Sequence, residues 1–584
     1  MIKQKLKFSV LILNLLLWTA CTMTESKKPL NILWLVAEDL SPFYLNAYGD
    51  PRAPTPNLDR LAREGVVYTH IFSVSGVCSP SRATLATGLY PNSFGAQNMR
   101  TLNQQADARE VGLIDYQVVP PPEVKMVSEI MRENGYYTTN NAKEDYQFFK
   151  SELAWDESNI YAHWRNRPHE QTPFFSIFNF GVCHESGMWN FKKQLFDGDQ
   201  FPPDRNDKKW GTTFENTTVN LLVPEDMEVE IPPYLPQNEI GENAMRRIYT
   251  NIIRMDKGVG IILDQLEKDG LLEETIIVWY SDHGGPLPRQ KRLLYDSGLR
   301  VPMIIRYPNQ KRSGERDDRL ISFVDFPPTL LSMAGIAPPS YMQGQAFEGA
   351  YNKAKTPRTF IHGHADRFDE RVDLIRAVRN KRFKYLKNFH PDRPYYLPLA
   401  YREKMEVMQE LLRMRDAGEL DENQALWFRQ TKEEEELFDT ENDPHELNNI
   451  ANDPAYAEIL ATLRAECERW MKSIEDKGLI DELELIDTFY PNGKAQLTDV
   501  PTVEIRDGKV SVRCTTPGAR IGYRYRSEKA PYMGWKHYTD PIQEKEGDTL
   551  EIITHRLGFK YGITTVAEGR VGKTFFPPNR HDKK

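Results

Sequence analysis

Cys78 lies in the segment SVSGVCSPSRATLATGLYP (73–91), where its neighbours are polar and a proline follows two residues later. A cysteine of a hydrophobic core usually lies in an apolar run, and a disulfide-bonded cysteine needs a partner. Four further cysteines are scattered along the chain without a CxxC pair: Cys21, Cys183, Cys467 and Cys514. Because the spacing indicates neither a disulfide framework nor a zinc site, Cys78 is a candidate for a chemical role.

Groups that bind metal ions or anions follow four of the predicted strands. In chain order they are Glu38 with Asp39, Lys143 with Glu144 and Asp145, His184 with Glu185, and Asp282 with His283. Because ligands of an open parallel sheet bind beyond the carboxyl ends of its strands, these groups should meet at one edge. For any single strand a helix cap or a polar turn is the simpler explanation, but four such strands together favour a site.

The acidic groups indicate a divalent metal ion. Glu38, Asp39 and Asp282 supply the hard oxygen ligands that Ca²⁺ and Mg²⁺ prefer. His283 can add a neutral nitrogen ligand. The sequence therefore predicts a metal site formed by the ends of two strands far apart in the chain.

A basic cluster follows the last of these strands, in PRQKRLLYDSGLRVP (288–302). Together with Arg82 and Lys143, its cations can surround a tetrahedral anion in a chain that is acidic overall. A solvated basic loop is the alternative. The cations of the cluster are Arg289, Lys291 and Arg292. A divalent metal beside such cations indicates transfer of a phosphoryl or sulfuryl group.

The segment Cys78-Ser79-Pro80-Ser81-Arg82, continued by Thr87-Gly88, resembles the signature of the type I sulfatases, which share the alkaline-phosphatase-like fold. The upstream acidic pair and the downstream pattern SDHGG…K…Y…GLRVP strengthen the resemblance. It covers roughly residues 29 to 475 and includes ELFDTENDPHELNNIANDP (436–454). In that family a modifying enzyme oxidises the signature cysteine to formylglycine, and the aldehyde hydrate is the nucleophile. The resemblance implies the same for Cys78.

The resemblance also implies roles for the groups at the strand ends. It implies a Ca²⁺ ion bound by an oxygen of the modified Cys78 and by four side chains: Glu38, Asp39, Asp282 and His283. It implies that Arg82 orients the formylglycine. It implies that three further side chains hold the sulfate and assist the leaving group: Lys143, His184 and Lys291.

Three positions depart from the family pattern. Glu38 replaces the usual first aspartate, which keeps the charge but lengthens the side chain. His283 replaces the commoner asparagine. Asp145 stands where a histidine is usual, two residues after Lys143, so this position loses a proton carrier. The resemblance therefore assigns no firm role to Asp145.

Residues 221–272 and the motif VCHESGMW resemble the branch of the family that contains the N-sulfoglucosamine sulfohydrolases, or heparan sulfamidases. Lys291 departs from that branch, because its vertebrate members carry arginine there. The resemblance implies a sulfated saccharide substrate. It leaves open a sulfate ester of a polysaccharide, such as ulvan or a glycosaminoglycan, and the S–N bond of N-sulfoglucosamine. A phosphoesterase of the same fold and an inactive glycan-binding protein are further alternatives.

Strands and helices alternate from about residue 30, which predicts an α/β domain with a mainly parallel sheet. The predicted strands are 31–38, 135–141, 174–180 and 275–280. The predicted helices include 243–270 and 55–65, in which Thr55 suits the cap, Pro56 the first turn and Gly65 the exit.

The whole fold expected is α/β, with an alkaline-phosphatase-like core, helices on both faces of the sheet, a smaller C-terminal α+β subdomain and an appended small β-sandwich. The predicted boundaries are 1–21 for a signal peptide, 29–350 for the catalytic domain, 351–485 for the C-terminal subdomain and 498–584 for the β-sandwich. For the β-sandwich a packing role is preferred over contact with sugar.

The N-terminus is typical of an export signal, with Lys3, Lys5 and Lys7 before an apolar run from Phe8 to Trp18. Thr19-Ala20-Cys21 resembles a bacterial lipoprotein cleavage box, and cleavage by ordinary signal peptidase is the alternative. We therefore expect a protein of the periplasm or outer membrane of a Gram-negative bacterium, with membrane contact only through the lipid anchor. The net charge of -9 argues against a general nucleic-acid binder.

Overall fold

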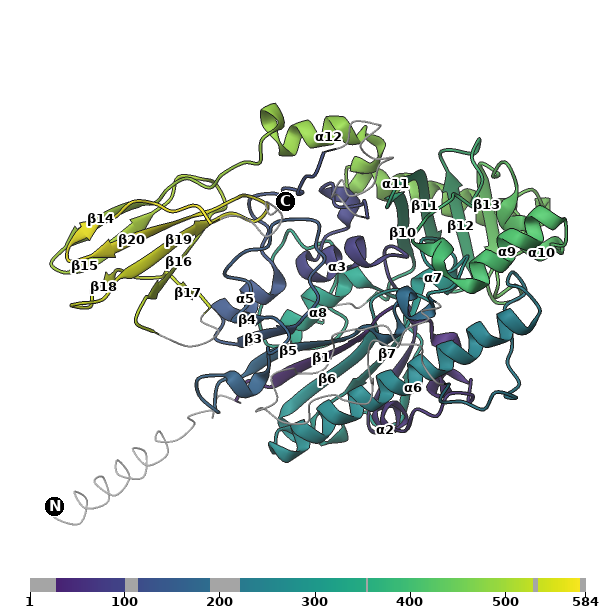
Figure 1. The fold of residues 1–584 in the computed structure, drawn as a ribbon, viewed down its shortest axis with the longest axis horizontal. Coiled ribbons are helices and arrows are strands. Elements are labelled where there is room, and N and C mark those ends of the chain that lie inside the picture. Colours follow the sequence, from purple (N-terminus) through teal and green to yellow (C-terminus); the bar gives the residue numbers. More distant parts are fainter. Residues whose placement is uncertain (1–27, 100–113, 190–220, 353–355, 529–533, 578–584) are drawn as a thin grey trace, which may run out of the picture.

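The computed structural model describes residues 28–99, 114–189, 221–352, 356–528 and 534–577, and Figure 1 shows its fold. The predicted signal peptide, including Cys21, lies outside these ranges. A nine-stranded sheet forms the centre, in the order β4-β3-β5-β1-β6-β7-β2-β8 with β9 beside β2. Its strands are β1 (Asn31–Ala37), β2 (Val66–Phe72), β3 (Tyr137–Asn141), β4 (Glu157–Ser158), β5 (Phe174–Phe180), β6 (Thr275–Ser281), β7 (Arg300–Arg306), β8 (Glu315–Asp317) and β9 (Ile321–Ser322).

The central sheet is mainly parallel, as predicted. β1 pairs in parallel with both β5 and β6, whereas β7 runs antiparallel to its neighbours β6 and β2. Successive residues of β1 enter opposite cores, since Leu33 and Leu35 pack on one face of the sheet and Ile32 and Trp34 on the other. A strand buried on both faces needs a continuous apolar run, which is why this segment was recognisable in the sequence.

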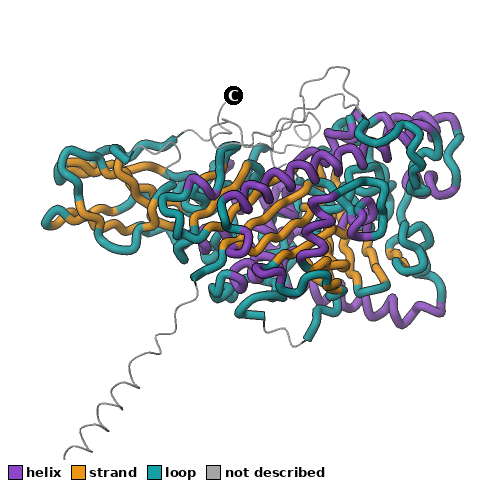
Figure 2. Tube along the Cα trace, turned by 90° about the horizontal axis from the view of Figure 1, so that it is seen from below, coloured by secondary structure: helices purple, strands orange, loops and turns teal. Residues whose placement is uncertain are grey.

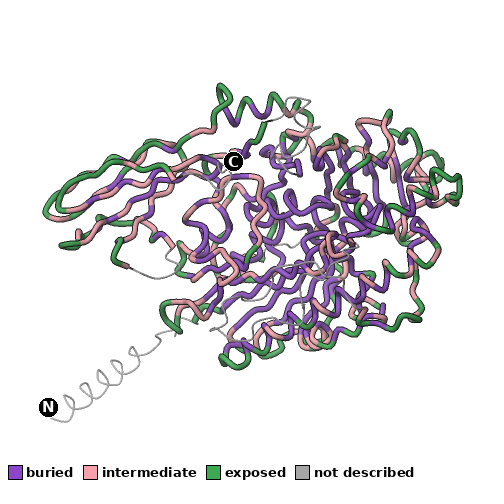
Figure 3. Tube along the Cα trace, viewed as in Figure 1, coloured by how far each residue is buried: buried purple, intermediate pink, exposed green. Residues whose placement is uncertain are grey.

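Helices cover both faces of the sheet (Figures 1 and 2). One face carries α2 (Pro56–Glu64) and α6 (Glu239–Lys268), and the other carries α3 (Cys78–Thr87), α5 (Val127–Glu133) and α8 (Phe326–Met333). Figure 3 shows that the strands between these layers are buried. The predicted fold class is therefore confirmed for the core. Within the described residues, no helix is both long and apolar enough to cross a membrane.

The helix predicted at 55–65 is present, but the residues at its two ends have different roles from those predicted. Thr55 occupies the N-cap position without capping a backbone N–H, and its hydroxyl instead lies 3.4 Å from Asp59 Oδ1. Gly65 has a negative φ of −135°. Glycine is needed there because a Cβ would lie 2.4 Å from the carbonyl oxygen of Ile305 in β7. The close approach of strand and helix, not a left-handed turn, selects this residue.

A second, antiparallel sheet follows the core, in the order β10-β11-β12-β13. Its strands are β10 (Ile361–Phe368), β11 (Arg371–Arg379), β12 (Phe383–Asn388) and β13 (Glu435–Asp439). The helices of this part are α9 (Glu406–Ala417), α10 (Glu422–Ala425), α11 (Ala457–Ser473) and α12 (Glu482–Phe489). The α11 side chains Leu463 and Cys467 pack on this sheet, in a hydrophobic cluster with Val378 and Tyr385. The expected α+β subdomain is therefore present, although its predicted boundaries stay predictions.

A buried ion-pair network holds this subdomain together around Arg376 of β11. Its guanidinium binds Asp476 at 2.6 Å and Asp366 at 2.9 Å, and all three side chains are buried. Arg376→Leu should lower the free energy of unfolding by about 3–5 kcal/mol, because two carboxylates would stay buried without their cation. Urea unfolding followed by circular dichroism measures the change.

Arg413→Leu is the matched control, because Arg413 is half exposed and pairs with Glu410 on the surface of α9. It should lower the free energy of unfolding far less than Arg376→Leu does, because water screens this exposed pair. Equal losses in the two variants would contradict the structural role given to Arg376.

The tail forms two antiparallel sheets around a small core of their own. The strands are β14 (Thr502–Arg506), β15 (Lys509–Arg513), β16 (Arg520–Tyr525), β17 (Lys536–His537), β18 (Ile542–Gln543), β19 (Leu550–His555), β20 (Gly562–Ala567) and β21 (Arg570–Val571). The buried Trp535 packs against Leu153 of the core, and Arg132 of α5 donates to its carbonyl oxygen at 2.8 Å. These contacts agree with the packing role preferred for the β-sandwich.

Candidate active site

The carboxyl ends of β1 and β6 bring the predicted metal ligands together. Glu38 and Asp39 follow β1, and Asp282 and His283 follow β6; all four are buried. The Asp39 backbone N–H donates to Asp282 Oδ1 at 3.2 Å, which joins the two strand ends directly. The edge predicted from the sequence is therefore where these groups meet.

Glycine is required immediately after these ligands. Gly284 donates its N–H to the carbonyl oxygen of Gly298 at 2.8 Å, and a Cβ on Gly284 would lie 2.2 Å from the carbonyl oxygen of Ser297. The loop that leaves β6 is thereby pressed against the segment that enters β7. This close approach explains the first glycine of the SDHGG motif.

Cys78 is the first residue of α3, fully buried beside the ends of β1 and β6. Its Sγ lies 3.3 Å from His283 Nε2 and 4.0 Å from Asp39 Oδ1. The potential ligand atoms of Cys78, Asp282 and His283 lie within 4.8 Å of one another, and so do those of Asp39, Cys78 and His184. The cysteine is thus the shared member of two potential metal-binding groups.

The donor set suits a hard divalent cation. Although burial acts to raise the pKa of Asp39, Lys291 and His283 outweigh it and hold this carboxyl ionised. Burial acts to lower the pKa of His283, but the charges of Asp282 and Asp39 raise it to about 10. The negative potential that favours a proton on this imidazole would also favour a bound cation. Carboxylate oxygens are the ligands that Ca²⁺ prefers, and His283 in its neutral form would add one nitrogen ligand.

Two cationic side chains of the site bind the Glu38 carboxylate. Its Oε2 accepts from Lys143 Nζ at 2.8 Å, and its Oε1 accepts from Arg82 at 3.4 Å. The Arg82 Nε also lies 3.1 Å from Asp282 Oδ2. Arg82 therefore joins the acidic ends of β1 and β6, and the direct binding of a metal by Glu38 stays a prediction.

Two lysines govern the ionisation of Cys78. Lys291 Nζ lies 3.7 Å from Cys78 Sγ and 2.5 Å from Asp39 Oδ2. Burial acts to raise the pKa of the thiol, but the charges of Lys143 and Lys291 outweigh it and lower the value to about 6. The surroundings of position 78 thus stabilise negative charge, which is what an anionic substrate requires.

His184 lies at the outer side of this cluster, in the short helical segment after β5. It is half-buried, and its Nδ1 lies 2.9 Å from Ser186 Oγ. One of its ring nitrogens lies within 4.8 Å of the potential ligand atoms of Asp39 and Cys78. The structure thus brings Cys78 together with the cationic and imidazole side chains predicted from the sequence: Arg82, Lys143, His184 and Lys291.

The prediction that the whole basic cluster surrounds the anion is wrong. Arg292 turns away and binds both Glu185 carboxylate oxygens, at 2.7 and 2.8 Å, as well as Asp369. Arg289 donates to the carbonyl oxygens of His445 and Glu446 in the C-terminal subdomain. Both arginines have positive φ, 65° and 73°, so this loop turns sharply on either side of Lys291. Neither arginine is solvated, since both are buried.

Asn179 is a site residue that the sequence analysis missed. It lies near the end of β5, where its Oδ1 accepts from Arg82 at 2.7 Å and its Nδ2 donates to Asn140 Oδ1 at 3.1 Å. A lone amide in the apolar run FFSIFNF was the available signal. Asp145, the doubtful position, has a positive φ of 59° and is half-buried.

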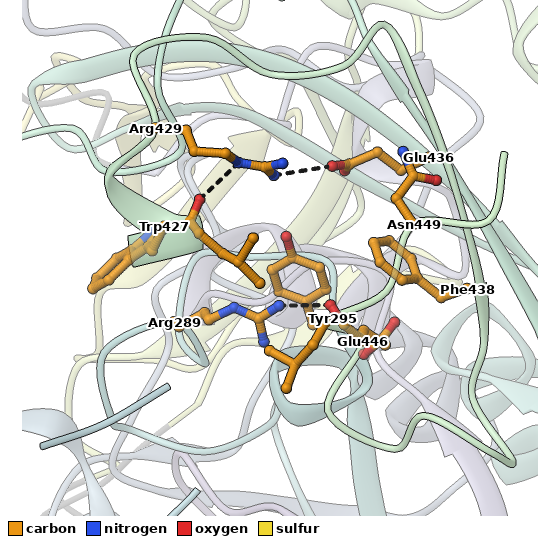
Figure 4. A pocket seen from close by; sticks show the side chains of 10 residues that line it. Arg289, Tyr295, Trp427, Arg429, Glu436, Phe438, Glu446 and Asn449 are labelled. Carbon is orange, nitrogen blue, oxygen red and sulfur yellow. Dashed lines mark hydrogen bonds and ion pairs between the residues drawn. The ribbon is translucent and has the colours of Figure 1, made fainter. Parts of the chain in front are cut away.

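Arg289 and Tyr295, on either side of Lys291 in the chain, lie against side chains of the C-terminal subdomain (Figure 4). A cavity of about 60 Å³ lies between them, and the Arg289 guanidinium stacks on the Tyr295 ring at 3.9 Å. The Glu446 carboxylate accepts from the backbone N–H of Asp296 and binds Lys384 at 2.8 Å. The segment from 289 to 296 is thereby attached to the C-terminal subdomain at both ends.

Glu446 gives this attachment a predicted pH dependence. Burial raises its pKa to about 7 despite Lys384. Its stabilising contribution is therefore complete below the ordinary glutamate pKa of about 4.3 and is lost as the pH rises through 7. Glu446→Gln does not titrate, so the stability of the variant relative to the wild type should rise by about 3 kcal/mol between pH 4.5 and 7.5. Urea unfolding at both pH values measures this.

The exposed Glu441→Gln serves as the control and should show no such trend. A Glu446→Gln variant whose relative stability is the same at both pH values would contradict the buried charge at this position.

Comparisons with known proteins agree with this geometry. The sulfatase family profile matches residues 30–336, and the profile of the N-sulphoglucosamine sulphohydrolase C-terminal region matches residues 289–425. An ulvan-active sulfatase of Formosa agariphila is 48% identical over 553 residues, 92% of this chain and 91% of that protein. The human N-sulphoglucosamine sulphohydrolase is 26% identical over 482 residues, 77% of this chain and 91% of that protein.

Solved structures show a shared fold. A protein determined in complex with its substrate D-glucosamine-2-N,6-O-disulfate has a TM-score of 0.54 and 19% identity, covering 78% of this chain and all of that one. A Bacteroides thetaiotaomicron structure has a TM-score of 0.53 and 19% identity, covering 77% of this chain and 93% of that one. The expected fold is confirmed by these neighbours.

Proposed function

This chain belongs to the sulfatase family, and on that premise we propose that it hydrolyses sulfate esters of a sulfated polysaccharide or its oligosaccharides, of the ulvan or glycosaminoglycan type. The observation that carries the proposal is Cys78, buried at the start of α3 between the acidic ends of β1 and β6 and two lysines. The similarity to an ulvan-active sulfatase over 92% of the chain supports the polysaccharide class.

Cys78 is proposed as the precursor of formylglycine. Oxidation by a modifying enzyme would replace its CH₂–SH group by an aldehyde, whose hydrate supplies the nucleophilic oxygen. Because Cys78 is fully buried in the folded chain, the modifying enzyme would have to reach the motif before α3 packs. The buried Arg82 remains beside the same carboxylates and would orient the new group.

The residues that would hold Ca²⁺ are Asp39, Asp282 and His283, with Glu38 as the fourth candidate. A bound Ca²⁺ supplies positive charge to the sulfate oxygens. Lys143 and Lys291 would neutralise further negative charge on the sulfate, since both already act on the anionic form of Cys78. His184, or alternatively Lys291, would donate the proton to the departing sugar oxygen.

We also propose that the protein is exported and anchored to a membrane by a lipid. The apolar run before Cys21 supports translocation to the periplasm or outer membrane, with Cys21 lipidated. In that location the enzyme would meet saccharides produced by depolymerisation outside the cytoplasm. Mass spectrometry of the mature N-terminus would separate a lipidated Cys21 from cleavage by ordinary signal peptidase.

A sulfamidase is the second candidate function. The match of residues 289–425 to the N-sulphoglucosamine sulphohydrolase C-terminal region favours it. A panel of sulfated saccharides, with ulvan oligosaccharides, glycosaminoglycan disaccharides and N-sulfoglucosamine as members, distinguishes the two by released sulfate. Release from sulfate esters supports the proposal, whereas release from N-sulfoglucosamine alone would replace it by the sulfamidase. Release of phosphate from phosphate esters, with no sulfate from any member, would exclude both.

A further inference from the structure

Aromatic side chains and one lysine lie beside His184, at the junction of the catalytic domain and the C-terminal subdomain. Trp189 belongs to the catalytic domain, and Tyr401 and Lys404 come from the segment before α9. The Tyr401 ring lies 4.5 Å from the Trp189 ring and 6.2 Å from the His184 ring, in edge-on geometry in both cases. A continuous row of rings therefore leads away from the catalytic centre.

Charged side chains of the catalytic centre act on Tyr401, the middle ring of this row. Burial raises the pKa of Tyr401, with a further contribution from Glu185, and the charges of Lys291 and Asp39 also act on it. The ligand atoms of His184, Asp39 and Cys78 lie within 4.8 Å of one another. The row of rings therefore adjoins, through His184, the cluster that contains Cys78.

Lys404 provides a cation at the far end of the row. Its Nζ lies 4.3 Å from the centre of the Trp189 ring and 5.5 Å from that of Tyr401. Lys404 is exposed, and within the described ranges no carboxylate lies at salt-bridge distance from it. Its charge is therefore available to an anionic ligand lying on the rings.

The backbone holds these side chains in position. Trp189 pairs with Met405 as an isolated antiparallel bridge, and its carbonyl oxygen accepts from Arg247 of α6 at 3.0 Å. Met405 itself is buried and occupies the N-cap position at the start of α9. Because both segments are fixed to buried elements, the rings and the cation form a preorganised surface.

We propose that Trp189, Tyr401 and Lys404 form a second sugar-binding subsite, which takes the ring next to the sulfated sugar when that ring carries an anionic group. The inference rests on the proposed polysaccharide sulfatase function. The apolar C–H face of a pyranose would pack on the half-buried aromatic rings. The Lys404 ammonium would bind a carboxylate or a second sulfate of that sugar, as a charge-assisted hydrogen bond.

The chemistry of the subsite predicts a substrate preference. Binding energy from a remote ring can lower KM or raise kcat for an oligosaccharide, and a sulfated monosaccharide cannot obtain it. The measured quantity is therefore the ratio of kcat/KM on an oligosaccharide to kcat/KM on the sulfated monosaccharide that it contains. This ratio isolates the neighbouring ring from the chemistry at Cys78.

The test compares Lys404→Ala and Trp189→Ala with the wild type, using ulvan oligosaccharides and the corresponding sulfated monosaccharide. Each variant should lower the ratio about tenfold, the effect of losing one exposed charge-assisted contact or one stacked ring. Lys404→Arg should recover most of the loss, because it restores the charge. Lys381→Ala, which removes an exposed lysine paired with Asp318, is the matched control and should leave the ratio unchanged.

Oligosaccharides with chemically reduced carboxyl groups show whether Lys404 binds a carboxylate or a second sulfate of the neighbouring sugar. If the wild-type ratio falls tenfold on the reduced substrate and Lys404→Ala causes no further loss, the lysine binds a carboxylate. If the wild-type ratio is retained on the reduced substrate and Lys404→Ala still lowers it, the lysine binds a second sulfate.

The same assays distinguish an error in the subsite proposal from an error in the proposed function. Ratios within twofold of the wild type for both Lys404→Ala and Trp189→Ala, in an enzyme that releases sulfate, would overturn the subsite alone. An enzyme that releases no sulfate from any of these saccharides would overturn the proposed function and the subsite with it.

Discussion

Replacing Cys78 by alanine is expected to abolish sulfate release, lowering kcat/KM by at least about four orders of magnitude, while the protein still folds. Removal of the nucleophile of a covalent mechanism typically costs a factor of that order or more. Cys78 is the residue shared by both potential metal-binding groups, and no other thiol of the described chain lies in them. Released sulfate measures the activity, and circular dichroism with thermal unfolding measures the fold.

Cys467→Ala is the matched control for this change. Cys467 is a buried thiol on the sheet-facing side of α11, in a separate hydrophobic cluster of the C-terminal subdomain. Its replacement should keep turnover within about twofold of the wild type, since it removes only packing. Retention of more than a few percent of activity by Cys78→Ala would contradict the mechanism.

The second large effect is expected at Lys291. Lys291→Ala should lower kcat by about 10²–10³, the usual cost of removing one group that stabilises charge in the transition state. The same change leaves Asp39, a potential metal ligand, without its 2.5 Å partner, so a loss of stability of a few kcal/mol is also expected. Steady-state kinetics at saturating substrate and urea unfolding measure the two effects separately.

Lys291→Arg keeps the charge and tests whether stability alone explains the loss. It should fold like the wild type and retain more activity than the alanine variant, because a guanidinium can still bind Asp39 and the sulfate. Lys381→Ala is again the surface control. If Lys291→Ala folds stably and turns over at the wild-type rate, Lys291 has no part in catalysis.

The sequence predicted those parts of the fold that depend on local pattern. The apolar runs of β1 and β6 and the long stripe of α6 were recognisable because buried strands and helices need them. The acidic pairs at the strand ends followed from the same reasoning, since parallel strands deliver their ends to one edge. Asp39 and Asp282 therefore lie together as expected.

The direction of side chains in loops could not be predicted. Arg289, Lys291 and Arg292 are nearly consecutive, yet one binds the C-terminal subdomain, one reaches Cys78 and one binds Glu185. Positive φ angles at the two arginines produce this divergence, and they depend on contacts with residues far away in the chain.

Long-range partners also explain the residues that were missed. Asn179 is fixed by Arg82 of α3 and by Asn140 and Asn141 of β3, so its importance appears only when two strands and a helix are assembled. The proposed subsite joins Trp189 to Tyr401 across more than two hundred residues of sequence. No local spacing connects such residues.

The mass of the peptide that contains Cys78 tests the central claim most directly. Trypsin should release residues 64–82 from protein produced with the modifying enzyme. We predict a peptide in which one oxygen has replaced one sulfur and two hydrogens, the signature of formylglycine. An unmodified thiol at position 78, in a preparation that releases sulfate at its full rate, would contradict the account.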